Sequence, residues 1–272
     1  MNLVAVVILY NPDVSLTKNI NSYLGTVKCL IALDNSKTNS AKILLPESDK
    51  IIYQSDGENK GISYRLNQAL KICIENGFEY LLTMDQDSSF DEIDLNVYLS
   101  RVLDYKNSKI GMFGINLDQH DKNDYDNEMF ITSGSILNVG HAIEIGGFDE
   151  NLFIDEVDNE FCLRLISKGY FTKRFGNISM NHQFGTTRKV LTPSLKYKDR
   201  VIYSPLRNYY NTRNYFYVNS IYTHDYKQKR DRLIMLKYRI KNSLLYENTL
   251  KTIYYVVRGY LDFCLNRMGK IK

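Results

Sequence analysis

The sequence has little cysteine and no long apolar run, and both shortages exclude classes of protein. Its four cysteines are scattered over 272 residues without a Cys-x-x-Cys pair, which argues against a disulfide framework and against a zinc site. No apolar run approaches the roughly 20 residues that span a bilayer. The first apolar run, residues 3–9, has no basic region before it and no small-residue cleavage site after it. We therefore expect a cytoplasmic chain.

Glycine-rich phosphate loops are absent as well. Neither Gly-x-Gly-x-x-Gly nor a Gly-Lys-Ser/Thr loop occurs, which disfavours a dehydrogenase or a P-loop enzyme. A sugar-phosphate nucleotidyltransferase would need a glycine-rich loop directly after the first strand, where this chain has Tyr10-Asn11-Pro12. With 44% hydrophobic and 24% charged residues, the composition is that of a folded globular protein.

The charge is divided unevenly along the chain. Residues 1–186 hold 16 Lys+Arg against 26 Asp+Glu, and residues 187–272 hold 19 against 5, so the two parts carry −10 and +14. The acidic part suits a bound cation, and the basic, tyrosine-rich tail suits an anionic partner. The tail could pack as a helical lid with its lysines in water, or rest on an anionic membrane surface. A non-enzymatic protein that binds nucleic acid through this tail is the alternative function.

The apolar pattern predicts an α/β fold, with a mostly parallel central sheet flanked by helices. The predicted strands are residues 4–9, 29–33, 51–53, 80–84 and 110–115. The predicted helices are residues 16–24, 62–73 (with Asn59 near its cap), 97–105 and 158–168, and helical periodicity continues from Pro205. We expect one α/β domain over residues 1–200 and a basic, aromatic helical extension over 201–272.

Two carboxylates follow the fourth predicted strand directly, in the triplet Asp85-Gln86-Asp87. Open α/β sheets bind ligands at the carboxyl ends of their strands, and Mg²⁺ or Mn²⁺ prefers one or two carboxylates plus phosphate oxygens. A solvated turn is the alternative interpretation. A calcium loop is excluded, because Phe90 and Asn96 stand where that loop needs glycine and glutamate.

Three further features have both a binding and a structural interpretation. Asp34 ends the second strand, where it could accept from a base or a ribose hydroxyl, or serve as a turn acid. The backbone donors of Asn59-Lys60-Gly61 could face a diphosphate at a helix start, or simply cap the helix. Asp158 could be a catalytic carboxylate or a helix N-cap.

Seven blocks, in order, resemble those of the family 2 inverting glycosyltransferases of the GT-A fold, and more narrowly the bacterial rhamnosyltransferase-like group. The blocks are VVILYNPD, LDNS, NKGISYRLNQAL, MDQDSS, GGFDENLFIDEVDNEFCLRLISKGY, NHQFG and SPLRNYYNTRNYFYV. The resemblance covers about residues 3–218. The stretch FIDEVDNEF is its most diagnostic part.

The resemblance implies roles for individual residues on the donor side. The nucleotide-sugar pocket would be formed by Tyr10, Asn11, Asp34, Asn59, Gly61 and Asp85. Asp87 would ligate a divalent metal, Mn²⁺ or Mg²⁺, that bridges the diphosphate. Asp85 would contact the ribose or a water on the metal, and His182 would approach the metal or the diphosphate; a buried, hydrogen-bonded histidine is the alternative for His182.

The catalytic base implied by the resemblance is Asp158. The chain departs here from many family members, because Val157 precedes Asp158 and Glu160 follows it, so Asp155 and Glu160 stay open as alternatives. The residues expected on the acceptor side are Asp155, Arg207, Tyr210 and Arg213.

The implied reaction is an inverting, metal-assisted sugar transfer from a nucleotide diphosphate to a hydroxyl. L-rhamnose from dTDP-rhamnose is the expected donor, with another donor such as a UDP-hexose as the alternative. The expected acceptor is a lipid-linked oligosaccharide in the synthesis of a cell-surface polysaccharide such as capsule or O-antigen. The enzyme would then work peripherally at the inner face of the bacterial membrane, with no nucleic acid as a partner.

Overall fold

The computed structural model describes residues 1–115, 117, 122–182, 185–192, 195–222 and 226–272. The chain forms two compact units, the first made of Met1–Glu150 and Val157–His182 and the second of Asn151–Glu156 and Gln183–Lys272. The chain thus enters the second unit twice. The domain boundary expected at residue 200 lies inside strand β12 (Tyr197–Ile202) of the second unit.

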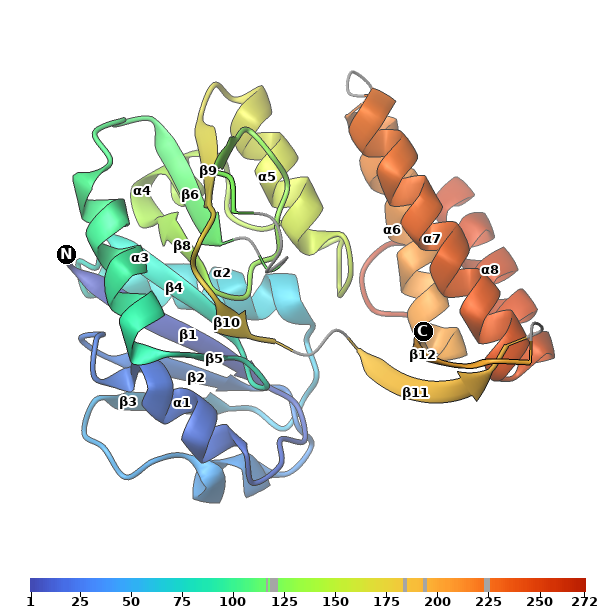
Figure 1. Cartoon of the computed structure of the whole chain (residues 1–272), viewed down its shortest axis with the longest axis horizontal. Helices are drawn as coiled ribbons and strands as arrows, with labels where there is room; N and C mark the ends of the chain where they lie inside the picture. Colours follow the sequence, from blue (N-terminus) through green and yellow to red (C-terminus); the bar gives the residue numbers. More distant parts are fainter. Residues whose placement is uncertain (116, 118–121, 183–184, 193–194, 223–225) are drawn as a thin grey trace. The chain divides into compact units, whose positions relative to one another are not determined.

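The first unit is built on one eight-stranded sheet (Figure 1). In spatial order its strands are β3 (Ile51–Ser55), β2 (Leu30–Asp34), β1 (Leu3–Leu9), β4 (Tyr80–Asp85), β8 (Ser135–Asn138), β6 (Ile110–Ile115), β9 (Phe171–Phe175) and β7 (Tyr125–Asp126). The first four are parallel to one another, whereas β8 runs antiparallel between β4 and β6. The predicted strands and the mostly parallel sheet are confirmed.

Helices cover both faces of this sheet. They are α1 (Leu16–Leu24), α2 (Ile62–Glu75), α3 (Glu92–Asp104), α4 (Val139–Glu144) and α5 (Val157–Ser167), with a short 3₁₀ helix η1 at Asn39–Leu44. Alternate residues of β1, such as Ala5 and Val7, share one buried cluster with Ile20 of α1 and Tyr98 of α3. In Figure 1, α1 and α3 lie in front of the sheet and α2 lies behind it. Because β1 is buried on both faces, it is apolar along its whole length.

The strand register brings polar residues together at one edge. Asp34 lies opposite Leu9 of β1 and Ser55 of β3, and Asp85 lies opposite Ile8. Strand order reverses between β1 and β4, which is where open α/β sheets bind their ligands.

A second, two-stranded sheet pairs β5 (Ser89–Phe90) with β10 (Met180–Asn181). The strands are antiparallel, with Asn181 opposite Ser89. The register continued by one residue puts His182 opposite Ser88. A segment far along the chain therefore returns to the end of β4.

The second unit combines an antiparallel pair, β11 (Thr186–Leu191) and β12, with three helices. The helices are α6 (Pro205–Ile221), α7 (Tyr226–Tyr246) and α8 (Thr249–Cys264), which confirms the helical periodicity predicted from Pro205. Helices α6 and α8 approach closely at Gly259, where an added Cβ would lie 2.6 Å from the Tyr209 carbonyl oxygen. In the described part of the chain, no helix combines the length and the apolarity that a membrane crossing requires.

Candidate active site

Asp85, Asp87 and His182 form one group at the carboxyl end of β4. One ligand atom from each residue lies within 4.8 Å of the others. Both carboxylates are exposed and the imidazole is half-buried. The structure thus brings together the three residues predicted on the metal side, although His182 is 95 positions from Asp87 in the chain.

A pair of buried serines holds His182 in this group. Its Nδ1 lies 2.8 Å from Ser88 Oγ, and Ser133 Oγ donates to Ser88 Oγ at 3.0 Å. Ser133 Oγ also accepts the Asp85 amide at 3.1 Å, so the serines join His182 to the end of β4. The sequence analysis missed both serines, and only the position of Ser88 beside Asp87 could have drawn attention to it.

The donor set fits a divalent cation. Two carboxylates and an imidazole suit Mn²⁺ or a similar first-row ion, and phosphate oxygens and waters can complete its coordination. Burial lowers the pKa of His182, although the nearby Asp87 carboxylate acts in the opposite direction. The neutral imidazole, which is the form that binds metals, is therefore favoured.

The residues after β1 reach across to β4 and β2. The Tyr10 amide donates to Gln86 Oε1 at 2.8 Å, and the Asn11 amide donates to Ser36 Oγ at 2.7 Å. Asn11 has a φ of 46°, a left-handed conformation that asparagine adopts more readily than most residues. The Tyr10 side chain is 53% exposed at this edge. Tyr10 and Asn11 thus lie at the sheet edge, as predicted.

Asp34 is fully buried, and both of its carboxylate oxygens have donors. Oδ1 accepts the Ser36 amide and Oδ2 accepts the Tyr53 hydroxyl, each at 2.8 Å. Burial, together with the hydrogen bond to Asp34, raises the pKa of Tyr53 to about 12, which keeps the phenol a donor. In this structure the carboxylate holds the turn after β2, and its contact with a base stays a prediction.

The start of α2 differs from the expected cap. Gly61, with a φ of 88°, immediately precedes the helix, and Asn59 Oδ1 accepts the Gly61 amide at 3.0 Å. The Lys60 amide donates to Asn35 Oδ1 at 3.1 Å. Only glycine adopts the Gly61 conformation without strain. Asn59 accepts the Gly61 amide and so shapes the turn before the helix rather than capping the helix itself. Two of the amides expected to face a diphosphate have acceptors within the protein.

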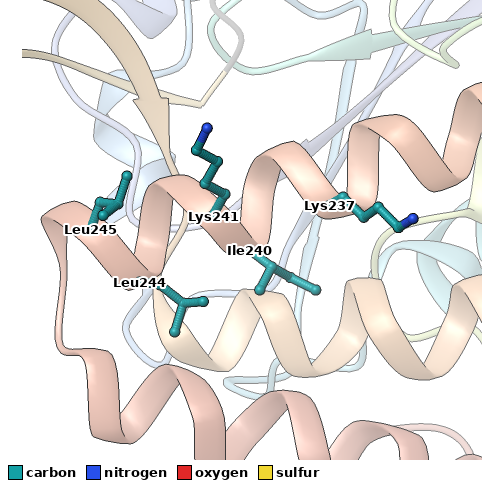
Figure 2. Close-up of a pocket in the computed structure, with 5 residues that line it drawn as sticks. All are labelled: Lys237, Ile240, Lys241, Leu244 and Leu245. Carbon is teal, nitrogen blue, oxygen red and sulfur yellow. The ribbon is translucent and has the colours of Figure 1, made fainter. Parts of the chain in front are cut away.

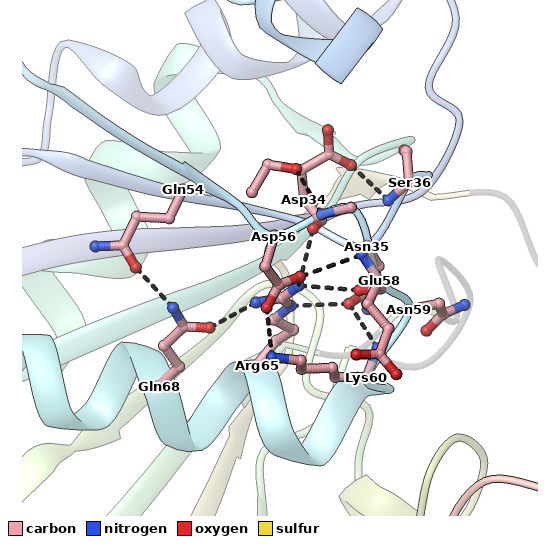
Figure 3. A network of polar contacts seen from close by, with 12 residues as sticks. Asp34, Asn35, Ser36, Gln54, Asp56, Glu58, Asn59, Lys60, Arg65 and Gln68 are labelled. Carbon is pink, nitrogen blue, oxygen red and sulfur yellow. Dashed lines mark hydrogen bonds and ion pairs between the residues drawn. The ribbon is translucent and has the colours of Figure 1, made fainter. Parts of the chain in front are cut away.

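A buried arginine organises this turn (Figure 3). Arg65 of α2 is 1% exposed and donates to five acceptors. These are Asn35 Oδ1, Gln68 Oε1, Asp56 Oδ1, and the carbonyl oxygens of Asp34 and Glu58. The guanidinium thus connects the ends of β2 and β3 to the helix that follows them.

Burial disfavours ionisation of Asp56, but hydrogen bonds from Arg65 and Lys60 outweigh it and hold the pKa of Asp56 below its ordinary value. This charged network was missed in the sequence, because Arg65 lies on an otherwise apolar helix face.

The three carboxylates considered as the base have different surroundings. Glu160 is buried and accepts from Arg164 at 2.8 Å within α5. The Asp155 side chain is 7% exposed and pairs with Arg207. Asp158 is half-buried in the first turn of α5, and its Oδ1 accepts the Asn159 amide at 3.0 Å. Arginines thus engage Glu160 and Asp155, and the choice of Asp158 as the base stays a prediction.

The residues before α5 are held in an unusual conformation within the second unit. Asp155 and Glu156 have φ values of 65° and 62°, which are costly for residues other than glycine. Arg207 grips Asp155 with two hydrogen bonds of 2.5 and 2.8 Å, and Arg232 pairs with Glu156 at 2.7 Å. Asn214 donates to the Asp155 carbonyl at 3.0 Å. These contacts stabilise a backbone that the sequence alone does not predict.

The other residues expected on the acceptor side are also buried. Arg213 is fully buried and donates to the Gly269 carbonyl at 2.8 Å, and the Tyr210 hydroxyl accepts the Ile271 amide at 3.0 Å. Both residues anchor the end of the chain to α6. Their contact with an acceptor stays a prediction.

A cavity in the second unit is lined by residues of α7 alone. It has a volume of about 300 Å³ and is lined by Lys237, Ile240, Lys241, Leu244 and Leu245 of α7 (Figure 2). Its lining is apolar apart from two lysines. It therefore lacks the acid and base groups that sugar transfer requires.

The chain is similar to known proteins in sequence and in fold. No protein-family model matches the chain. The chain is 28% identical to the dTDP-rhamnosyl transferase RfbF of Shigella flexneri, over 79% of each protein. Its structure is similar to the crystal structure of S. aureus TarS 1-349, with a TM-score of 0.60 and 15% identity over 97% of this chain and 80% of that one. A second S. aureus TarS structure has a TM-score of 0.54 at 13% identity, over 98% of this chain and 49% of that one.

These findings bear on the predicted fold and class of enzyme. The GT-A-like α/β fold with a C-terminal helical part is confirmed. The predicted glycosyltransferase class agrees with the curated relative and with the fold.

Proposed function

We propose that the chain is an inverting glycosyltransferase that moves a sugar from a nucleotide diphosphate to an acceptor hydroxyl. The observation that carries the proposal is the group formed by Asp85, Asp87 and His182 at the point where strand order reverses. This is where such a sheet binds a nucleotide. The ordered sequence blocks of a family 2 enzyme support the same assignment.

Asp85, Asp87 and His182 would hold a divalent cation, which supplies positive charge beside the departing diphosphate. The protein's part is to position the donor. Tyr10 and Gln86 form an edge for the nucleotide between β1 and β4, and Arg65 keeps the neighbouring turn rigid. A rigid site avoids reorganisation as charge develops on the leaving group.

Asp158 would accept the proton of the acceptor hydroxyl at its Oδ atoms while the sugar is transferred. The hydroxyl oxygen bonds to the anomeric carbon, the bond to the diphosphate breaks, and the proton passes to Asp158. Attack from the face opposite the leaving group inverts the configuration. A general base of this kind contributes about 10²- to 10⁴-fold to the rate.

The donor we propose is dTDP-L-rhamnose, because the curated relative is named a dTDP-rhamnosyl transferase. A UDP-hexose is the alternative donor. The acceptor we propose is a lipid-linked oligosaccharide of a cell-surface polysaccharide. The opposed charges of the two parts of the chain, −10 and +14, suit an enzyme with a cation on one side and an anionic carrier on the other.

A thermal-shift panel tests the donor site. The full chain is heated with dTDP, UDP, dTDP-rhamnose and UDP-glucose, each with and without Mn²⁺. A ligand at 100 times its Kd stabilises the native state by about 2.7 kcal/mol, which raises the midpoint clearly. We expect the rise with dTDP compounds to need Mn²⁺.

Matched variants make the test specific. Asp87→Asn removes a metal ligand and should abolish the Mn²⁺-dependent rise. Glu47→Gln neutralises an exposed carboxylate outside the group and should leave it intact. A rise that is equal without metal, or equal in Asp87→Asn, would remove the metal role. No rise with any nucleotide would overturn the proposed function.

A further inference from the structure

Helix α8 turns its apolar face to solvent. The large apolar residues exposed on it are Leu250, Ile253, Tyr254, Val257, Tyr260 and Leu261, all between 46% and 80% exposed. At 3.6 residues per turn, these side chains occupy an arc of about 120° around the helix. Amphipathic helices of globular proteins normally bury such a stripe.

The fully buried residues of α8 are small or polar, and the half-buried rings of Tyr255 and Phe263 pack against Tyr209 and Phe216 of α6. Thr252, Gly259 and Asp262 are its buried residues. The missing side chain of Gly259 lets the helix approach the backbone of α6 at Tyr209, whose hydroxyl donates to Asp262 at 2.9 Å. The rest of the stripe cannot turn inward without breaking this contact, while Tyr260 at its edge touches Phe216 of α6 with 4.9 Å between ring centroids.

The charges near the stripe are basic. Lys251 and Arg258 lie beside it on the helix, and Arg267, Lys270 and Lys272 follow within eight residues of its end. The acidic residue of the helix, Asp262, is buried and forms ion pairs with Arg258 and Arg267, each with 3.6 Å between nitrogen and oxygen. An apolar face with a basic border complements an anionic bilayer surface.

The dimensions of α8 fit a helix that lies in the interface. Its 16 residues extend about 24 Å, which is shorter than the roughly 30 Å hydrocarbon core of a bilayer. Tyr254 and Tyr260 suit the headgroup level. A second copy of the chain is a poorer occupant, because it would bring two tails of charge +14 together.

We propose that the exposed apolar face of α8 inserts into the surface of an anionic bilayer and docks the second unit there. This inference goes beyond the transfer reaction, and it would place the protein where a lipid-linked acceptor is found.

Flotation of the full chain with lipid vesicles tests the docking. The vesicles are phosphatidylcholine alone or phosphatidylcholine with phosphatidylglycerol. We expect binding to the anionic vesicles and weaker binding at high salt, because screening removes the electrostatic part. The triple variant Leu250→Ser, Val257→Ser, Leu261→Ser should lower binding by about tenfold or more, since the apolar part is lost.

A matched control keeps the number of apolar residues removed the same. Val14→Ser, Ile43→Ser, Ile93→Ser changes three residues of the first unit that are 79% to 85% exposed, and it should bind like the wild type. Circular dichroism checks that both variants fold.

Failure to float with anionic vesicles, or equal losses in the two triple variants, would overturn the proposal. Sedimentation provides a second check. A wild-type dimer that becomes a monomer in the α8 triple variant would also overturn the proposal, because the apolar face would then bind a second copy of the chain. The assay needs no sugar donor, so its outcome is independent of the nucleotide panel.

Discussion

Replacing Arg65 by methionine tests whether the buried guanidinium holds the donor side of the first unit together. Methionine keeps most of the length of the side chain and removes its donors. Five acceptors lose a hydrogen bond. Two of them, the Asp34 carbonyl oxygen and the side-chain oxygen Asn35 Oδ1, are buried, so water cannot replace the lost donor. The substitution therefore removes polar contacts more than packing.

The expected loss follows from these acceptors. A buried acceptor left without a donor costs about 1–3 kcal/mol, although Asn35 Oδ1 keeps the Lys60 amide. Asp56 is about a third exposed, its side chain being 37% accessible, so it is partly rehydrated. We expect Arg65→Met to lower the free energy of unfolding by about 2–4 kcal/mol, mostly from the buried acceptors left without a donor. Arg65→Lys should fall between, because lysine keeps the charge but lacks the planar fork.

Urea unfolding followed by circular dichroism measures the change, and hydrogen exchange of the β2 amides assigns it to the first unit. Lys71→Met is the matched control, since Lys71 is on the same helix, is 77% exposed and lies 3.9 Å from Glu75. It should change stability by less than about 0.5 kcal/mol. An Arg65→Met variant within about 1 kcal/mol of the wild type, with an unchanged m value, would refute the reasoning.

Three more outcomes follow from the structure. Asp158→Asn should lower turnover about 10²- to 10⁴-fold without changing donor binding, as measured by product formation and thermal shift. Gly259→Ala should destabilise the second unit by about 1–3 kcal/mol in urea unfolding, because the added Cβ would meet the backbone of α6. Gly25→Ala is its control in the same assay. Gly25 has a helical φ of −65° and nothing within 4 Å of an added Cβ, so this variant should stabilise the first unit by about 0.4–1 kcal/mol. Burial raises the pKa of Cys162 to about 12, so a thiol reagent should modify the exposed Cys264 first. The thiol of Cys162 ionises more easily in the unfolded chain, at about pH 8.5. The free energy of unfolding should therefore fall between about pH 8.5 and 12, which alkaline unfolding measures.

The central strands were predictable because their burial leaves a direct mark on the sequence. A strand covered on both faces is apolar throughout, and residues 4–9 and 80–84 lie within the observed β1 and β4. The antiparallel β8 escaped prediction, because four residues carry too little pattern and its place in the sheet depends on long-range pairing.

The metal-side carboxylates were predictable for a similar reason, since they directly follow a buried strand. The surroundings of His182 were not. They depend on the pairing of the two-residue strands β5 and β10, which leaves no periodic signal in either segment. Arg65 illustrates a different limit. Its position in a helix could be predicted, but its burial follows from acceptors at the ends of two separate strands.

The segment before α5 and helix α8 show how tertiary contacts override local preference. Aspartate tolerates a left-handed backbone better than most residues, but two such residues in a row are not predictable from Asp155 and Glu156, because arginines on other helices hold them there. Apolar periodicity predicts that α8 is amphipathic, but not which face is covered. That choice rests on Gly259 and its close approach to α6.

The second unit contains two separate segments of the chain, Asn151–Glu156 and Gln183–Lys272, and this affects the design of truncated variants. A fragment that stops at residue 182 keeps Asp155 and Glu156 but loses Arg207 and Arg232, their cationic partners. Two carboxylates would be left side by side in a strained backbone, immediately upstream of the helix that carries Asp158. Expression of the first 182 residues alone would thus remove the partners that hold residues 155 and 156, and inactivity of such a fragment would say nothing about the proposed chemistry of the intact chain.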